Sequence, residues 1–232
     1  MRRIARKWTA SRSAAITLGA VAAALAVTGC AQTQLGAAAL YSNQRISSSK
    51  LADEVANLNA GYQIYKHKVQ INYTPADMPR QVLSWMLRFA TSERLAAQRG
   101  IVVTPAQAQH ELALETANVR QAGDTLAEAA VLNGLPPDML PQLGRWISIE
   151  VQLSRQLDHG VPPQTAAQSN ALTAETSHLQ CVAAKSLDIM VNPQYGVYDY
   201  AHFIVVAKPN SLAKAPGGGL PSAATPQLTP KC

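Results

Sequence analysis

A change in hydrophobic spacing near the C-terminal end is the feature that most constrains the fold of this chain. Apolar residues recur every three or four positions through most of residues 51–185, which is the spacing of one face of an α-helix. From Leu187 through Ile189 to Val191 they alternate with polar residues instead, which is strand spacing. The sequence therefore predicts a mainly α fold, with about six helices and a small β element.

Capping signals and glycines divide the helical region into segments. Thr104 and Gln107 match a capping box, and Thr125 and Glu128 match a second one. Gly100 fits the end of a helix, because glycine adopts the left-handed backbone conformation without steric cost. The expected helices begin near Ser47, Pro79, Thr104, Thr125, Leu135 and Thr165.

Two regions outside these helices have the composition of β structure. Ala37–Tyr41 is a short apolar run that a turn separates from Ile46. Asn192–Gly196 contains the proline and glycine of a turn, and strand-like residues resume over Val197–Ala207. We expect a short strand and a turn before the first helix, and a strand, a turn and a second strand-like segment after the last one.

Residues 1–29 have the composition of an export signal. Five basic residues precede an apolar stretch, Ala14–Val27, which is too short for a comfortable membrane span. Val27-Thr28-Gly29-Cys30 resembles the lipobox of bacterial lipoproteins, in which the cysteine receives a diacylglyceryl group. That resemblance implies lipidation at Cys30 and anchoring at the outer face of the cell membrane. The alternative is an ordinary signal peptide followed by an incidental cysteine.

The remaining residues are expected to form a tether, one domain and a tail. The tether covers residues 30–36, the helical domain 37–207, and a low-complexity, disordered tail 208–232. Without residues 1–29, 15 basic and 14 acidic residues leave a net charge of +1. A nucleic-acid partner is not expected, because no basic stripe with interleaved aromatic residues is present.

Two cysteines follow Cys30, at positions 181 and 232. Outside the cytoplasm two thiols can pair, and a Cys181–Cys232 bridge would attach the last residue to the domain. The sequence leaves open whether they pair or stay as two thiols. A thiol oxidoreductase is not expected, because the chain has no Cys-x-x-Cys motif.

The sequence contains no pattern of a catalytic, cofactor-binding or metal site. Its five histidines do not form a His-x-x-x-His or His-Glu-x-x-His pair, and no phosphate-binding glycine loop is present. We therefore expect no enzyme activity and no cofactor. A group of large apolar residues can instead line a groove for polypeptides, or can simply fill the core. These residues are Trp85, Trp146, Met78, Met86 and Met139.

The order of these motifs resembles a known family. Gly100–Thr104 leads from one helix into the next, Gly134–Leu140 enters a long helix, and Asn192–Gly196 follows the last helix. Over Ala37–Asp199 the chain is similar to the N-terminal domain of SurA/PrsA-type extracytoplasmic foldases, in the lipoprotein form common in actinobacteria. The resemblance implies that the N-terminal and C-terminal segments pair. Physical reasoning supports this pairing, because two short strands are not stable alone.

The chain departs from that family in two respects. The family carries a parvulin prolyl isomerase domain, and the interval between Leu157 and Val191 is too short for one. The usual Asn-Gly of the first turn is Asn43-Gln44 here. The resemblance therefore implies a membrane-anchored chaperone that binds unfolded secreted polypeptides and has no isomerase activity. The alternatives are an adaptor lipoprotein with one cell-envelope partner, or a prolyl isomerase.

Overall fold

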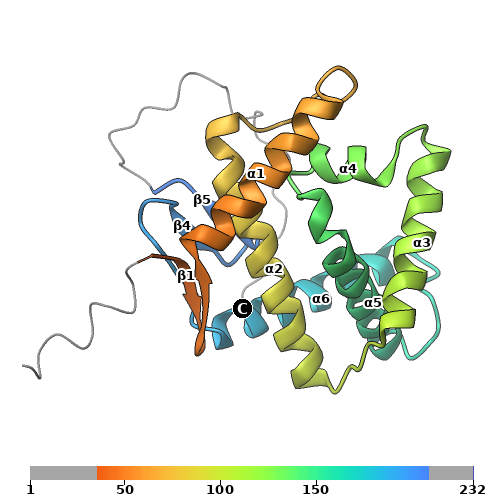
Figure 1. Ribbon diagram of the computed structural model, residues 1–232. Helices are drawn as coiled ribbons and strands as arrows, with labels where there is room; N and C mark the ends of the chain where they lie inside the picture. Colours follow the sequence, from red (N-terminus) through yellow and green to blue (C-terminus); the bar gives the residue numbers. More distant parts are fainter. Residues whose placement is uncertain (1–35, 209–231) are drawn as a thin grey trace, which may run out of the picture. The chain divides into compact units, whose positions relative to one another are not determined.

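The computed structural model describes residues 36–208 together with Cys232, which belong to one compact unit (Figure 1). Six α-helices account for most of this unit. The prediction of a mainly α fold with about six helices and a small β element is thereby confirmed. The helices are α1 Ser48–Tyr65, α2 Met78–Arg99, α3 Pro105–Gln121, α4 Leu126–Leu132, α5 Leu140–Leu157 and α6 Ala166–Ser186. Two 3₁₀ turns, η1 Pro75–Asp77 and η2 Pro137–Met139, precede α2 and α5.

The helix starts follow the capping chemistry of the sequence. The Thr104 hydroxyl accepts a hydrogen bond from the Gln107 backbone N–H at 3.3 Å, and the Gln107 side chain accepts from the Thr104 N–H at 2.8 Å. Thr125 and Glu128 form the second predicted box, in which the Thr125 N–H donates to Glu128 at 2.7 Å. Each box satisfies backbone donors that have no partner within the helix.

The two ends of the helical region meet in a three-stranded sheet. Its strands are β1 Ala37–Tyr41, β2 Gln44–Ser47 and β3 Met190–Val191, in the order β2-β1-β3. Strand β3 is antiparallel to β1, with Val191 opposite Ala39. The Asn192 side chain donates to the Ala37 carbonyl at 3.0 Å and extends this pairing. The predicted pairing of the N-terminal and C-terminal segments is therefore present.

The residues after Asn192 do not continue this pairing. The predicted turn at Asn192–Gly196 is present and is followed by a separate antiparallel hairpin of β4 Val197–Asp199 and β5 Ile204–Val206. The strand-like residues Val197–Ala207 thus form two strands that pair with each other. Gly196 has a φ of +130°, and a Cβ at this position would collide with the Val206 carbonyl, so only glycine brings the two strands this close.

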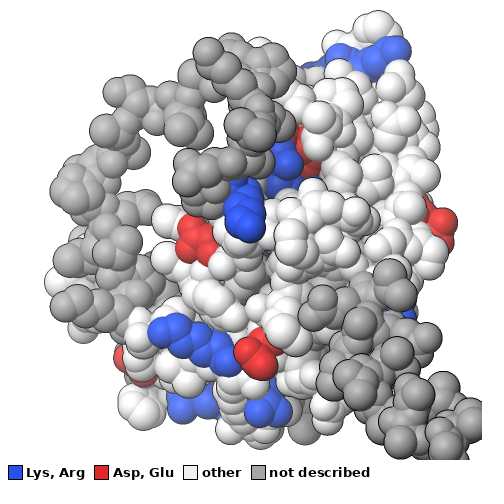
Figure 2. Space-filling view, turned by 90° about the vertical axis from the view of Figure 1, so that its left-hand side faces the viewer, with Lys and Arg blue, Asp and Glu red and all other residues white. Residues whose placement is uncertain are grey.

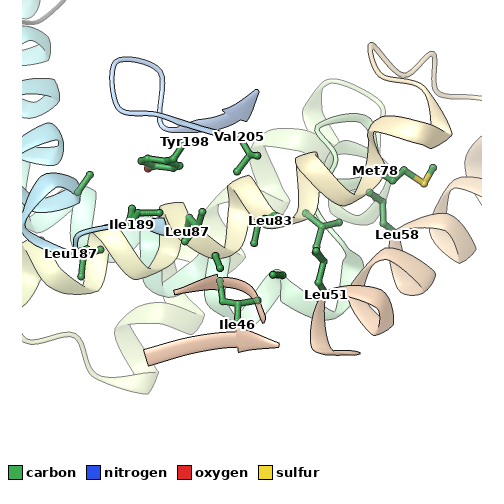
Figure 3. Packing of buried hydrophobic residues seen from close by; sticks show 14 of the residues in the cluster. Ile46, Leu51, Leu58, Met78, Leu83, Leu87, Leu187, Ile189, Tyr198 and Val205 are labelled. Carbon is green, nitrogen blue, oxygen red and sulfur yellow. The ribbon is translucent and has the colours of Figure 1, made fainter. Parts of the chain in front are cut away.

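Helix α2 runs through the centre of the main core. Figure 3 shows it between hairpin β4–β5 on one side and strands β1 and β2 on the other, with Leu83 and Leu87 on the buried surface. Tyr198 and Val205 reach the core from the hairpin, and Ile46 reaches it from β2. The apolar residues of α2 cover more than one face of the helix because α2 is covered on several sides.

The remaining helices pack beside this core. Helix α3 lies along α5, and the two backbones approach closely at Gly144 (Figure 1). Within residues 36–208, none of the helices combines the length and the apolar character needed to cross a membrane. The predictions for residues 1–35 and 209–231, including the signal peptide and lipidation at Cys30, lie outside the described residues.

Candidate functional site

A solvent-open groove of about 640 Å³ lies between the β1–β2 hairpin and helices α1, α2 and α5. This volume is in the range of sites that bind small molecules or short peptide segments. Its lining combines aromatic, aliphatic and charged side chains. The apolar ones include Tyr41, Ile46, Met86, Phe89, Met139 and Trp146.

The apolar floor of the groove comes mainly from α2 and α5. Met86, Phe89 and Trp146 are half-buried, so part of each side chain remains accessible. The Trp85 ring contacts two of these residues. Its centroid lies 5.7 Å from that of the Phe89 ring and 6.0 Å from that of the Trp146 ring. Edge-to-face and tilted aromatic contacts of this kind hold the rings in place, which preforms the floor.

The sequence left open whether five large apolar residues line a groove or fill the core. The structure divides them. Met86, Met139 and Trp146 line the groove, and Met139 is also buried against Leu135 and Leu143. Met78 is buried in the core beside Leu58, and Trp85 donates its indole N–H to the Asn133 carbonyl at 2.9 Å.

Four of the charged groups on the rim of the groove form two ion pairs, and a fifth, Arg94, instead donates to the Ser186 hydroxyl at 3.0 Å. Lys50 and Glu54 form an ion pair across one turn of α1 at 2.5 Å. Arg145 of α5 makes a bidentate pair with Glu93 of α2, and a third bond, 3.0 Å long, to the Val103 carbonyl. The Glu93 carboxylate raises the pKa of Arg145, which stays charged. The floor is therefore apolar, and these rim charges largely cancel.

Charges elsewhere on the described surface are dispersed. On the face shown in Figure 2, basic and acidic side chains are interspersed among uncharged residues, and some of them lie side by side. The five histidines are all exposed, and within residues 36–208 and Cys232 no three His, Cys, Asp or Glu side chains are placed to hold a metal ion. His202 contacts Asp199 at 2.7 Å, on the turn of the β4–β5 hairpin.

Cys181 and Cys232 are joined in a disulfide, with their Cα atoms 5.7 Å apart, within the normal range for such bridges. Cys181 is buried in α6, and Lys185 donates to the backbone carbonyl of Cys232 at 3.1 Å. The bridge thus attaches the final residue of the chain to the domain. It lies on α6, which contributes no residue to the groove.

Sequence reasoning missed part of the groove. Phe89 belongs to no motif in the sequence, and the Arg145–Glu93 pair joins residues 52 positions apart. The one available signal was the broad apolar surface of residues 79–99, which is wider than a single core contact requires. Comparisons with protein-family models, with characterised proteins and with solved structures gave no match for this chain.

Proposed function

We propose that this protein is a chaperone that binds unfolded or secreted polypeptides outside the cytoplasm, while a lipid at Cys30 anchors it to the membrane. The observation that carries the proposal is the open groove, whose floor contains Met86, Phe89 and Trp146. Methionine and aromatic side chains adapt to varied apolar partners, which suits a protein with many clients.

The rim chemistry supports binding without sequence selectivity. Because Lys50 pairs with Glu54 and Arg145 pairs with Glu93, Arg94 is left as the one groove-lining charge of the described residues outside an ion pair, and the rim selects neither acidic nor basic clients strongly. In an extended polypeptide every second side chain points to the same side, so a segment with alternating apolar residues presents them together. Such a segment can place them on the floor while its ends leave through the open side.

Strand β2 adds a second, backbone-directed mode of binding. It lies at the edge of the three-stranded sheet, and its Gln44 and Ile46 line the groove. Edge strands accept extended peptides through main-chain hydrogen bonds, which do not depend on the side chains of the client. The groove therefore combines an apolar floor with an adjacent strand edge.

The direct test is suppression of aggregation of an unfolded model protein by the purified chain. We expect light scattering to fall as the chain approaches equimolar amounts, and Phe89→Gln to weaken this effect several-fold. The matched control is Ile64→Gln, which changes an apolar residue that is 70% exposed and lies outside the groove. Full aggregation at several-fold excess of the wild-type chain would refute the proposal.

A second measurement covers the case in which Phe89→Gln unfolds. A photo-crosslinking residue at Gln142, an exposed position on the groove, should form adducts with many unfolded clients. The same residue at Val102, which is 77% exposed and away from the groove, should not. One stoichiometric adduct from membranes would favour the adaptor function instead. Membrane anchoring is tested by the loss of membrane association in Cys30→Ser.

A further inference from the structure

A second, smaller cavity of about 270 Å³ lies behind the floor of the groove. Helices α2, α5 and α6 and the β4–β5 hairpin each contribute to its wall. Ser92 and Trp146 line both this cavity and the groove, so the two are neighbours. The other lining residues are Arg88, Thr91, Glu150, Ser177, Gln180 and Phe203. The lining of this cavity is thus more polar than the floor of the groove.

Arg88 is the only cation of this lining, and no carboxylate of the described residues lies within ion-pair distance of it. Its guanidinium lies 4.5 Å from the centre of the Trp85 ring, and it makes no ion pair or hydrogen bond within the described part of the chain. Burial lowers the pKa of Arg88, which reflects the loss of water around its charge. A partly buried cation of this kind is costly unless something pairs with it.

Two hydroxyl groups of the same wall also lack regular hydrogen bonds. Thr91 and Ser92 are each only 3% exposed, and neither hydroxyl makes a hydrogen bond of regular geometry among residues 36–208, although the Tyr198 hydroxyl lies close to that of Thr91. Buried polar atoms in native proteins are nearly always hydrogen-bonded, so unpaired ones need an explanation. Both residues follow Arg88 on α2, one turn further along the helix.

The acidic group of the cavity interacts with this cation only at longer range. Glu150 accepts a 2.9 Å hydrogen bond from the Gln180 side chain and makes no ion-pair contact with Arg88 in the described structure. Burial raises the pKa of Glu150, because water no longer stabilises its charge, although the Arg88 charge acts to lower that pKa. The cavity therefore holds a cation without a direct anionic contact, two hydroxyls without regular hydrogen bonds and a separate acceptor.

We infer that this cavity binds a small carboxylate-bearing molecule, with its carboxylate on Arg88 and the hydroxyls of Thr91 and Ser92. A guanidinium matches a carboxylate in geometry and charge, and hydroxyl donors complete its hydrogen bonding. Glu150 then suits a donor on the same molecule, as in a free α-amino acid. Trp146 and Phe203 provide apolar walls for its side chain. This site does not depend on polypeptide binding in the groove.

The test is a titration of the purified full chain followed by calorimetry and tryptophan fluorescence. The probes are L-leucine and L-leucinamide, which differ only in the carboxylate. We expect saturable binding of L-leucine, and binding of L-leucinamide at least tenfold weaker. The inference would be overturned if neither L-leucine nor the peptides described below gave a saturable signal up to about 10 mM. A dissociation constant of about 10 mM corresponds to a binding free energy of only about 3 kcal/mol.

Variants and peptide probes complete the design. Arg88→Met should weaken L-leucine binding at least tenfold, and Thr91→Val several-fold, whereas Arg155→Met, an exposed arginine on α5, should bind as the wild type. Thr91→Val keeps the test decisive if Arg88→Met does not fold. Unchanged affinity in a folded variant of either residue would overturn the inference. A short peptide with a free C-terminus, compared with its amide, tests a polypeptide source of the same carboxylate; preference for the free form supports the site.

Discussion

The backbone N–H of Val205 donates a 2.8 Å hydrogen bond to the Ser84 hydroxyl, joining residues 121 positions apart in sequence. Ser84 in turn donates to the Arg80 carbonyl at 2.6 Å, so its hydroxyl uses both a donor and an acceptor site. Strand β5 is thereby attached to the middle of α2 by a buried bond. The β4–β5 hairpin, which closes one wall of the polar cavity through Phe203, depends on this attachment.

Ser84→Ala should destabilise the protein by about 1–3 kcal/mol, because it leaves the buried N–H of Val205 without an acceptor. The measurement is the free energy of unfolding from urea denaturation. Ser169→Ala is the matched control, since Ser169 is exposed on α6 and we expect a change within about 0.5 kcal/mol. Equal stability of the two variants would mean that the bond to Val205 contributes nothing.

Gly144→Ala should also destabilise the protein, although alanine is the better helix former by about 1 kcal/mol. A Cβ at Gly144 would lie 2.5 Å from the Ala108 carbonyl oxygen and 3.0 Å from the Leu112 Cβ. Helices α3 and α5 must therefore move apart, at a cost of about 1–3 kcal/mol. The measurement is again urea denaturation, and an increase in stability would show that the helices separate without cost.

The helices were predictable because their ends are encoded locally. Thr104 with Gln107, and Thr125 with Glu128, fix helix starts through contacts within four residues, and Gly100 ends α2 with a φ of +67°. Propensity and capping both act at short range, so a sequence reveals them. The same holds for the change of period that predicted strand β3.

The groove and the cavity were less predictable because their walls come from distant segments. Glu93 and Arg145 are 52 positions apart, and neither carries a motif. Arg88 stands in an amphipathic helix, where an arginine is ordinarily a solvated surface residue. Only the packing of α5 and α6 against α2 makes it a partly buried cation, and that packing depends on three-dimensional contacts rather than on spacing. The turn before Val197 and the strand-like residues after it were predicted, but their pairing with each other as β4 and β5 was not, because no turn motif marks residues 200–203.

Cys232→Ser should lower the free energy of unfolding by about 3–4 kcal/mol, because the disulfide to Cys181 closes a loop with a sequence separation of 51 residues. The closed loop restricts the unfolded chain more than the folded one. Thermal unfolding of wild type with and without reductant provides the comparison. Reductant should destabilise the wild type to about the level of Cys232→Ser and leave the variant unchanged. A wild type that is insensitive to reductant would contradict this account.

Glu128→Gln should reduce the dependence of stability on acid. The Thr125 backbone N–H, followed by the Lys68 ammonium, holds the pKa of Glu128 below its ordinary value. A carboxyl with a lowered folded-state pKa contributes stability above its unfolded value, near 4.5, and loses that contribution as the pH falls through the folded value. The wild type should therefore lose stability more steeply than Glu128→Gln as the pH falls below about 5, while the variant should already be less stable at pH 7.

Urea denaturation between pH 7 and pH 3 measures this difference. Glu175→Gln, on the exposed surface of α6, is the matched control and should keep the wild-type slope. The Glu128 carboxylate contributes to stability mainly through its hydrogen bonds. Its ion pair with Lys68 contributes less, because the Lys68 ammonium is exposed and salt screens its charge. The slope difference should consequently persist in high salt. Parallel curves for the wild type and Glu128→Gln would show that the capping box does not distinguish the two protonation states.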